Sequence, residues 1–85
     1  MKAEELFEKL NVLKSVLEKY GLSKREHEVI YYWILDLDYK EISKLLFISE
    51  NTVRKHINNI NHKFNVHSRA SLILMLFLQL LNLID

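Results

Sequence analysis

Apolar residues in the first twenty positions recur at the spacing of one helix face. Separated by 4, 3, 4 and 3 positions, they are Leu6, Leu10, Leu13, Leu17 and Tyr20. Side chains at these spacings fall in a narrow stripe along one side of an α-helix. The single glycine, Gly21, follows the stripe, and glycine readily adopts the left-handed conformation that ends a helix. The pattern predicts an amphipathic helix over residues 1–20.

Two capping boxes predict where the next two helices begin. Ser23 and Glu26 stand three positions apart, so each side chain can bond the free backbone N–H of the other residue. Asp38 and Glu41 repeat this arrangement. The boxes open predicted helices over 24–35 and 39–46.

Serine caps open the last two predicted helices. Ser49 precedes an amphipathic segment over 50–64, and Asn65, which tolerates left-handed geometry, follows it. Ser68 precedes an apolar segment that reaches about Leu83. Because the chain has no proline and one glycine, little interrupts regular structure. We therefore expect an all-α fold of five helices.

The connection between the helices predicted over 39–46 and 50–64 is only three or four residues long. Two helices joined by so short a connection cross steeply, which is the helix-turn-helix arrangement. Ser43 is small and lies where the two helices would approach most closely. The apolar side chains that we expect to be buried around the turn are Ile42, Leu46, Ile48 and Val53.

The helix predicted over 50–64 has two chemically different faces. At about 100° per residue, one face gathers Val53, Ile57, Ile60 and Phe64, which predicts the core face. The opposite face carries Asn51, Arg54, Lys55, Asn58, Asn61 and His62. No carboxylate is among them. Arginine and lysine can donate to guanine, and asparagine can bond adenine. The composition of this face therefore favours a helix that contacts DNA bases over an amphipathic helix whose outer face is merely solvated.

The charge of the chain is informative only in its placement. The formal net charge is +1, but the segment 49–69 is basic, with one carboxylate, Glu50, in its first turn. The basic residues and histidines of this segment are Arg54, Lys55, Lys63, Arg69, His56, His62 and His67. A basic segment in a nearly neutral domain is typical of phosphate binding, and the first backbone N–H groups of the helix could add to it.

The last predicted helix has two apolar faces. Leu72, Ile73, Leu76, Leu80 and Leu83 form one side, which we expect in the core. Leu74, Phe77, Leu78 and Leu81 form a second stripe on nearly the opposite side. Burying each of those four side chains would stabilise by roughly 1.5–3 kcal/mol. We expect a homodimer that pairs through this stripe about a two-fold axis. The alternative is that the helix over 1–20 folds back over it.

Several other classes of protein are disfavoured. The chain has no cysteine and no Gly-rich phosphate loop, and no pair of carboxylates lies in an apolar setting, so we expect neither an enzyme nor a cofactor. On a helix His56 and His62 point about 120° apart, which disfavours a metal site. The longest apolar run, 72–78, has seven residues, against about 18 for a membrane span, and no signal peptide is visible. We expect a cytoplasmic protein.

Several motifs together resemble the LuxR/GerE-type helix-turn-helix family. They are Leu22-Ser-Lys-Arg-Glu-His-Glu-Val29, Lys40-Glu-Ile-Ser43, the stretch LFISENTVRKHINNI over 46–60, Lys63-Phe64 and Val66-His-Ser-Arg69. The resemblance covers about 21–84 without a gap. It implies a four-helix domain whose third helix, 50–64, lies in the major groove and whose last helix pairs with a second copy. Sigma-factor domains share much of the pattern, but His56 and the 66–69 turn favour the LuxR/GerE type.

The resemblance also implies roles by position. Arg54, Lys55 and Asn58 would face the bases. Candidates for backbone contact, or for orienting the helix, are Lys40, Ser49, Asn51, Thr52, His56, Asn59 and Lys63. The sequence departs from the family where Asp36 and Asn65 replace common glycines and Lys24 replaces a common proline. Both Asp and Asn tolerate left-handed geometry, so the fold should be unchanged.

The sequence therefore predicts two parts: an N-terminal amphipathic helix over 1–20, for linkage or dimerisation, and a LuxR-type DNA-binding domain over 21–85. The predicted function is a sequence-specific regulator of transcription that binds double-stranded DNA at the bacterial nucleoid. RNA polymerase and an upstream sensor domain are further candidate partners; a membrane is not. The alternative is a protein–protein interaction or dimerisation module, or the DNA-binding output fragment of a larger two-component or ligand-sensing regulator.

Overall fold

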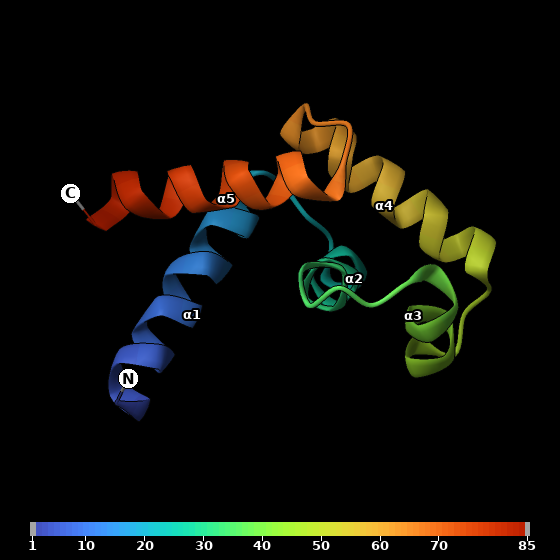
Figure 1. The fold of residues 1–85 in the computed structure, drawn as a ribbon, viewed down its shortest axis with the longest axis horizontal. Coiled ribbons are helices and arrows are strands. Elements are labelled where there is room, and N and C mark those ends of the chain that lie inside the picture. Colours follow the sequence, from blue (N-terminus) through green and yellow to red (C-terminus); the bar gives the residue numbers. More distant parts are fainter. Residues whose placement is uncertain (1, 85) are drawn as a thin grey trace.

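The computed structural model describes the backbone of residues 2–84 and the side chains of residues 2–5 and 8–81. Over this range the chain is all-helical (Figure 1), with helices α1 (Ala3–Lys19), α2 (Lys24–Ile34), α3 (Tyr39–Leu46), α4 (Glu50–Phe64) and α5 (Arg69–Ile84). The five predicted helices are confirmed, and each predicted boundary lies within about two residues of the observed one.

The predicted caps form as expected. In the first box, the Ser23 backbone N–H donates to Glu26 Oε1 at 2.8 Å, and the Glu26 N–H donates to Ser23 Oγ at 3.2 Å. The Asp38 box opens α3 in the same way. Ser49 Oγ accepts from the backbone N–H of Thr52 at 3.0 Å, and Ser68 caps α5 similarly. These local bonds satisfy the free donors that every helix start exposes.

The helix connections use left-handed residues. Asp36 and Asn65 have φ of 71° and 55°, which confirms that they adopt the geometry for which their family positions favour glycine. Phe47, in the turn between α3 and α4, has φ of 57° and is 95% exposed. This third left-handed residue was not predicted. Phe47 is the C-cap of α3, directly before the Ile48 N–H that donates to the Ser43 carbonyl, and a left-handed residue at this position ends the helix.

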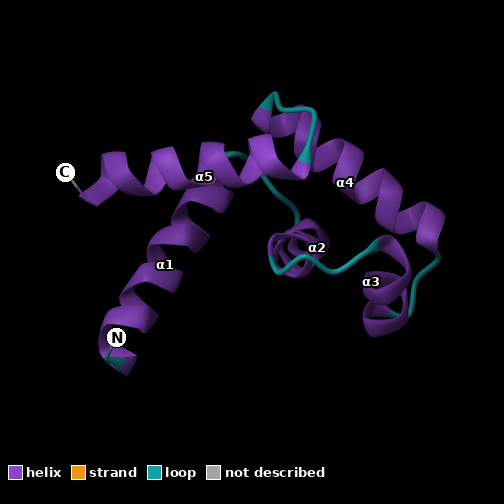
Figure 2. Cartoon of the chain, in the orientation of Figure 1, coloured by secondary structure: helices purple, strands orange, loops and turns teal. Residues whose placement is uncertain are grey.

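One core holds α2, α3 and α4 together. α2 and α3 each pack against α4, and the start of α5 closes the bundle (Figure 2). The predicted core face of α4, formed by Val53, Ile57, Ile60 and Phe64, is buried. Around the turn, Ile42 and Ser43 are buried as predicted, whereas Leu46 and Ile48 are only partly buried at its edge.

α1 packs against α5 and joins the same core through its last turns (Figure 1). Leu17, on the predicted apolar face, is buried, and so is the neighbouring Val16. The Tyr20 ring stacks on Phe64 with centroids 4.3 Å apart. Leu10, on the predicted apolar face of α1, is 50% exposed. Leu6 lies outside the described side chains.

α5 divides its apolar side chains between core and surface. Leu72 and Leu76 are buried as predicted and Leu80 is partly buried, but Ile73 is 40% exposed. That expectation was wrong because α1 meets α5 along the side of Leu76 and Leu80, and Ile73 is left at the edge of this contact. Leu83 lies outside the described side chains.

The second stripe of α5 remains at the surface. Its members, which we call the α5 stripe, are Leu74, Phe77, Leu78 and Leu81, between 41% and 57% exposed. α1 approaches this stripe where Val12 and Lys9 line an apolar pocket with Phe77 and Leu81. The alternative in which α1 folds back over the stripe therefore holds in part, and the stripe is still about half exposed.

The part of the chain that the structure describes contains neither a metal-ligand cluster nor a single helix that could cross a membrane. No group of three or more His, Cys, Asp or Glu residues is placed to hold an ion. Only α4 together with α5 up to Leu81, bent by 46° between them, reaches the length and apolar composition of a span.

Candidate nucleic-acid interface

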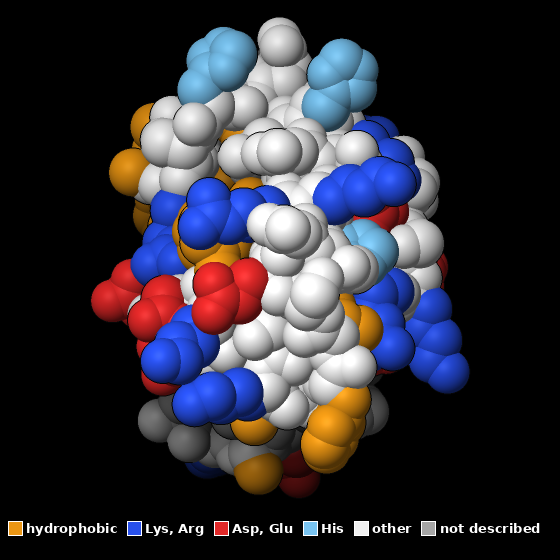
Figure 3. All heavy atoms as spheres, turned by 90° about the vertical axis from the view of Figure 1, so that its right-hand side faces the viewer, with side chains coloured by type: hydrophobic (Ala, Val, Ile, Leu, Met, Phe, Trp, Pro, Cys, Tyr) orange, Lys and Arg blue, Asp and Glu red, His pale blue; other side chains and the backbone are white. Residues whose placement is uncertain are grey.

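The outer face of α4 is open to solvent. Arg54, Lys55 and Asn58 are all exposed, and none of them turns into the core. They project from a helix whose opposite side is fully buried, so the backbone that carries them is held rigidly. Figure 3 shows Lys and Arg side chains spread over this side of the molecule, with Asp and Glu side chains gathered mainly to one side.

Arg54 rests on an aromatic ring. Its guanidinium carbon lies 4.7 Å from the centroid of the Tyr39 ring, at the start of α3. Arginine commonly stacks its flat guanidinium on aromatic faces in this way. Tyr39 was missed at the level of sequence, because nothing in its position along the chain places it beside α4.

The start of α4 uses its hydroxyl groups for capping. Ser49 Oγ accepts the Thr52 N–H and also lies 2.8 Å from Thr52 Oγ1. Ser49 and Asn51 are exposed, and Thr52 is partly buried. These residues lie at the N-terminal end of α4, and the N-terminus of a helix favours a bound anion.

The other candidate backbone contacts lie on two helices. Lys40 is exposed on α3 and Asn59 is exposed on α4, while His56 is partly buried. Asn61, expected on the outer face, is also partly buried, and its Oδ1 is enclosed near the turn that leads into α5. Toward the C-terminal end of α4, fewer side chains are therefore exposed on the outer face than the helical projection predicts.

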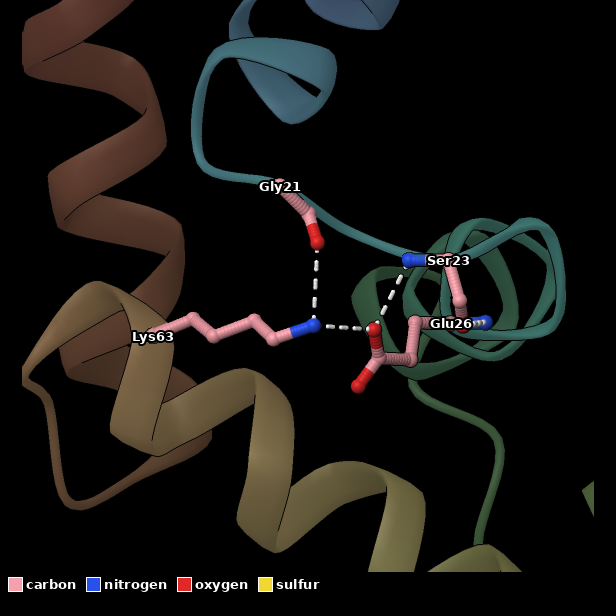
Figure 4. Close-up of polar contacts among 4 residues, drawn as sticks. All are labelled: Gly21, Ser23, Glu26 and Lys63. Atoms are coloured by element: carbon pink, nitrogen blue, oxygen red, sulfur yellow. Dashed lines mark hydrogen bonds and ion pairs between the residues drawn. The ribbon is translucent and has the colours of Figure 1, made fainter.

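Lys63 is bonded within the protein. Its ammonium donates to the Gly21 carbonyl at 3.0 Å and to Glu26 Oε1 at 2.6 Å (Figure 4). The same carboxylate oxygen accepts the Ser23 N–H, so one residue of α4 is tied to the α1–α2 connection and to the cap of α2. Of the two roles expected for Lys63, this geometry favours orienting α4.

The environment of Glu26 keeps its carboxylate charged. Burial alone raises the pKa of this carboxyl group. The hydrogen bonds from Lys63 and Ser23 and the positive charge of Lys63 act in the opposite direction and together outweigh burial. The pKa of Glu26 is therefore lower than its ordinary value, and this carboxylate is charged at neutral pH.

Arg69 fixes the connection between α2 and α3. Its guanidinium carbon lies 3.5 Å from the centroid of Trp33, and Nη2 donates to the Leu37 carbonyl at 2.7 Å. It also forms an ion pair with Asp36, the left-handed residue of this connection. The sequence identified Arg69 as a charge of the basic segment and as part of the 66–69 motif, but not its contacts, which come from residues more than thirty positions away.

Comparison with known proteins agrees with this geometry. Residues 20–76 match the family described as bacterial regulatory proteins, luxR family. The spore germination protein GerE of Bacillus subtilis is 46% identical over 63 residues, which are 74% of this chain and 85% of that protein.

Longer regulators match over a smaller share of their length. The nitrate/nitrite response regulator protein NarP of Escherichia coli is 43% identical over 58 residues, 68% of this chain and 26% of NarP. The transcriptional activator protein CarR of Pectobacterium carotovorum is 49% identical over 45 residues, 53% of this chain and 18% of CarR. No solved structure matches the chain significantly. The resemblance stated from the motifs is confirmed: this chain belongs to the luxR family of bacterial regulatory proteins and carries its DNA-binding helix-turn-helix domain.

Proposed function

We propose that this chain is a sequence-specific regulator of transcription that binds double-stranded DNA as a homodimer, with α4 of each copy in the major groove. The observation that supports the proposal most is the outer face of α4. Arg54, Lys55 and Asn58 extend from one rigid helix and are exposed, and the single carboxylate of that helix is Glu50 in its first turn. A rigid helix matters because ordering flexible donors on binding costs free energy and so weakens the affinity for DNA.

The proposed base contacts follow from side-chain chemistry. Arg54 and Lys55 would donate to O6 and N7 of guanine, and Asn58 would bond adenine at N6 and N7. The proposed contacts to the DNA backbone come from Lys40, Ser49, Asn51, Thr52, His56 and Asn59. Lys63 belongs to the same set, but its bonds to Glu26 and Gly21 support an orienting role.

The homodimer part of the proposal rests on the α5 stripe. Four large apolar side chains in one row, each about half exposed, are costly to leave in water. Pairing two copies of this row about a two-fold axis would cover it, and it would set two α4 helices at successive major grooves, about 34 Å apart.

Two alternative functions are also supported. The α5 stripe would equally serve a pure protein–protein module. The small share of NarP and CarR that matches is consistent with an output domain of a longer regulator, with an upstream sensor domain and RNA polymerase as candidate partners. The proposed function itself belongs in the bacterial cytoplasm, at the nucleoid.

Selection of bound sequences from a randomised duplex pool tests the proposal. We expect the chain to enrich two related half-sites whose centres lie about 10 base pairs apart, or a multiple of that spacing. Affinity for the selected duplex should fall steeply as salt rises, because cations bound to phosphates are released. No enrichment, together with an affinity that does not depend on salt, would contradict DNA binding and favour the protein-only module.

A further inference from the structure

Four side chains from four helices form a chain of stacked contacts that ends on the outer face of α4. The Arg69 guanidinium at the start of α5 lies over Trp33 of α2, 3.5 Å from its centroid. The Trp33 ring stacks on Tyr39 of α3, with centroids 5.3 Å apart and planes inclined by 17°. The Arg54 guanidinium of α4 lies over Tyr39 at 4.7 Å.

We propose that Tyr39 is a positioning residue for base recognition, because its ring sets the Arg54 guanidinium in place before DNA arrives. This inference rests on the proposed function, since it assumes that Arg54 contacts a base. An unrestrained arginine loses much side-chain freedom when it binds, and an arginine already held in place loses less.

Stacking suits this task because it uses only the flat face of the guanidinium. The N–H donors of arginine lie around the edge of that plane, so they stay available to a guanine. In the described part of the chain, no carboxylate forms an ion pair with Arg54. The ring of Tyr39 therefore restrains Arg54 without taking up its donors through a charged partner.

The Tyr39 ring is itself held by its neighbours. Trp33 and Tyr39 are both partly buried, and Arg69 is fixed by the Leu37 carbonyl and by Asp36 as well as by Trp33. Tyr39 is also the first residue of α3, directly after the Asp38 cap, so its backbone is fixed. A ring stacked on Trp33 and fixed through its backbone gives Arg54 a defined platform.

The readout is base preference, measured with the full chain. The reference is the duplex that the wild-type chain selects. The position of interest is the base pair at which Arg54→Ala loses discrimination, and the second duplex carries a substitution at that pair. The ratio of the two dissociation constants reports discrimination. A variant that is merely less folded weakens binding to both duplexes equally and leaves this ratio unchanged.

Tyr39→Leu should reduce the ratio by about threefold to fivefold, the fold-change that matches a cation–π contact at an exposed site. Tyr39→Phe keeps the ring and should keep the wild-type ratio. Once Arg54 is replaced by alanine, adding Tyr39→Leu should change the ratio no further. Tyr31→Leu is the matched control, because Tyr31 pairs with His27 and not with Arg54; it should leave the ratio as in the wild type.

Three results would overturn the inference. If Arg54→Ala abolishes discrimination but Tyr39→Leu leaves it intact, Tyr39 is a packing residue and the proposed function still holds. If Tyr39→Leu increases discrimination, the ring holds Arg54 away from the bases. If the wild-type chain discriminates at no base pair, the inference and the proposed function both fail.

Discussion

The Lys63 ammonium nitrogen lies 2.6 Å from Oε1 of Glu26, and this short contact joins the end of α4 to the beginning of α2. The Glu26 side chain is almost completely buried, whereas the Lys63 side chain is 34% exposed. The Gly21 carbonyl, which follows α1, shares the ammonium. The helix proposed to enter the groove is therefore anchored through the same residue to α2 and to the α1–α2 connection.

Replacing Glu26 and replacing Lys63 should each destabilise the fold, but by different amounts. Glu26→Gln keeps the shape and removes the charge, so we expect a loss of about 1–2 kcal/mol in the free energy of unfolding, moderated by the partial exposure of Lys63. Lys63→Met leaves a buried carboxylate without its cation and should cost more, about 2–3 kcal/mol. Urea denaturation measures both. A Lys63→Met variant as stable as the wild type would contradict this description of the pair.

The contribution of Glu26 to stability should depend on pH. Because its pKa is lowered in the folded chain, the contribution is fully present above the unfolded-state pKa of about 4.3 and is lost as the pH falls through the folded-state pKa. The difference in unfolding free energy between wild type and Glu26→Gln should be constant from roughly pH 8 to pH 5 and shrink below about pH 4. Denaturation curves across this range provide the check. A difference that grows on acidification has the wrong sign.

The left-handed Phe47 offers a test of backbone strain. Its exposed ring makes little packing, so removing it should cost little, while the conformation favours glycine. Phe47→Gly should be more stable than Phe47→Ala by about 0.5–1 kcal/mol, because alanine keeps the strain and glycine relieves it. Thermal melts of the two variants compare them directly. If alanine is the more stable of the two, the turn does not require this geometry.

The α5 stripe should determine oligomeric state. Leu74→Glu together with Leu78→Glu places two charges in the proposed interface, so the chain should sediment as a monomer while its helical content is retained. Leu35→Glu is the control, because Leu35 is an exposed leucine outside the stripe, and this variant should remain a dimer. A doubly substituted chain that still sediments as a dimer would place the interface elsewhere.

What the sequence predicted well is local. Caps such as Ser23 with Glu26 act over three positions, so their bonds can be inferred from spacing alone. The buried face of α4 follows from helical periodicity in the same way, and the structure confirms it. The exposed positions of Arg54 and Lys55 are the other side of that pattern.

What the sequence did not predict depends on how helices meet. Lys63 and Glu26 are 37 positions apart, and nothing in either segment identifies the other as its partner. Tyr39 reaches Arg54 only because α3 packs beside the start of α4. Ile73 was assigned to the core because α5 has two apolar faces, and only the approach of α1 decides which residues lie between them.

The most direct test of the central claim replaces Arg54, Lys55 and Asn58 together by alanine. Binding to the selected duplex and to an unrelated duplex is measured beside the melting temperature, since the three side chains are exposed and Arg54 contributes to the fold only through its stacking on Tyr39. We predict that the preference for the selected duplex disappears while the melting temperature is nearly unchanged. A triple variant that still prefers the selected duplex as strongly as the wild type would show that α4 does not contact the bases through this face.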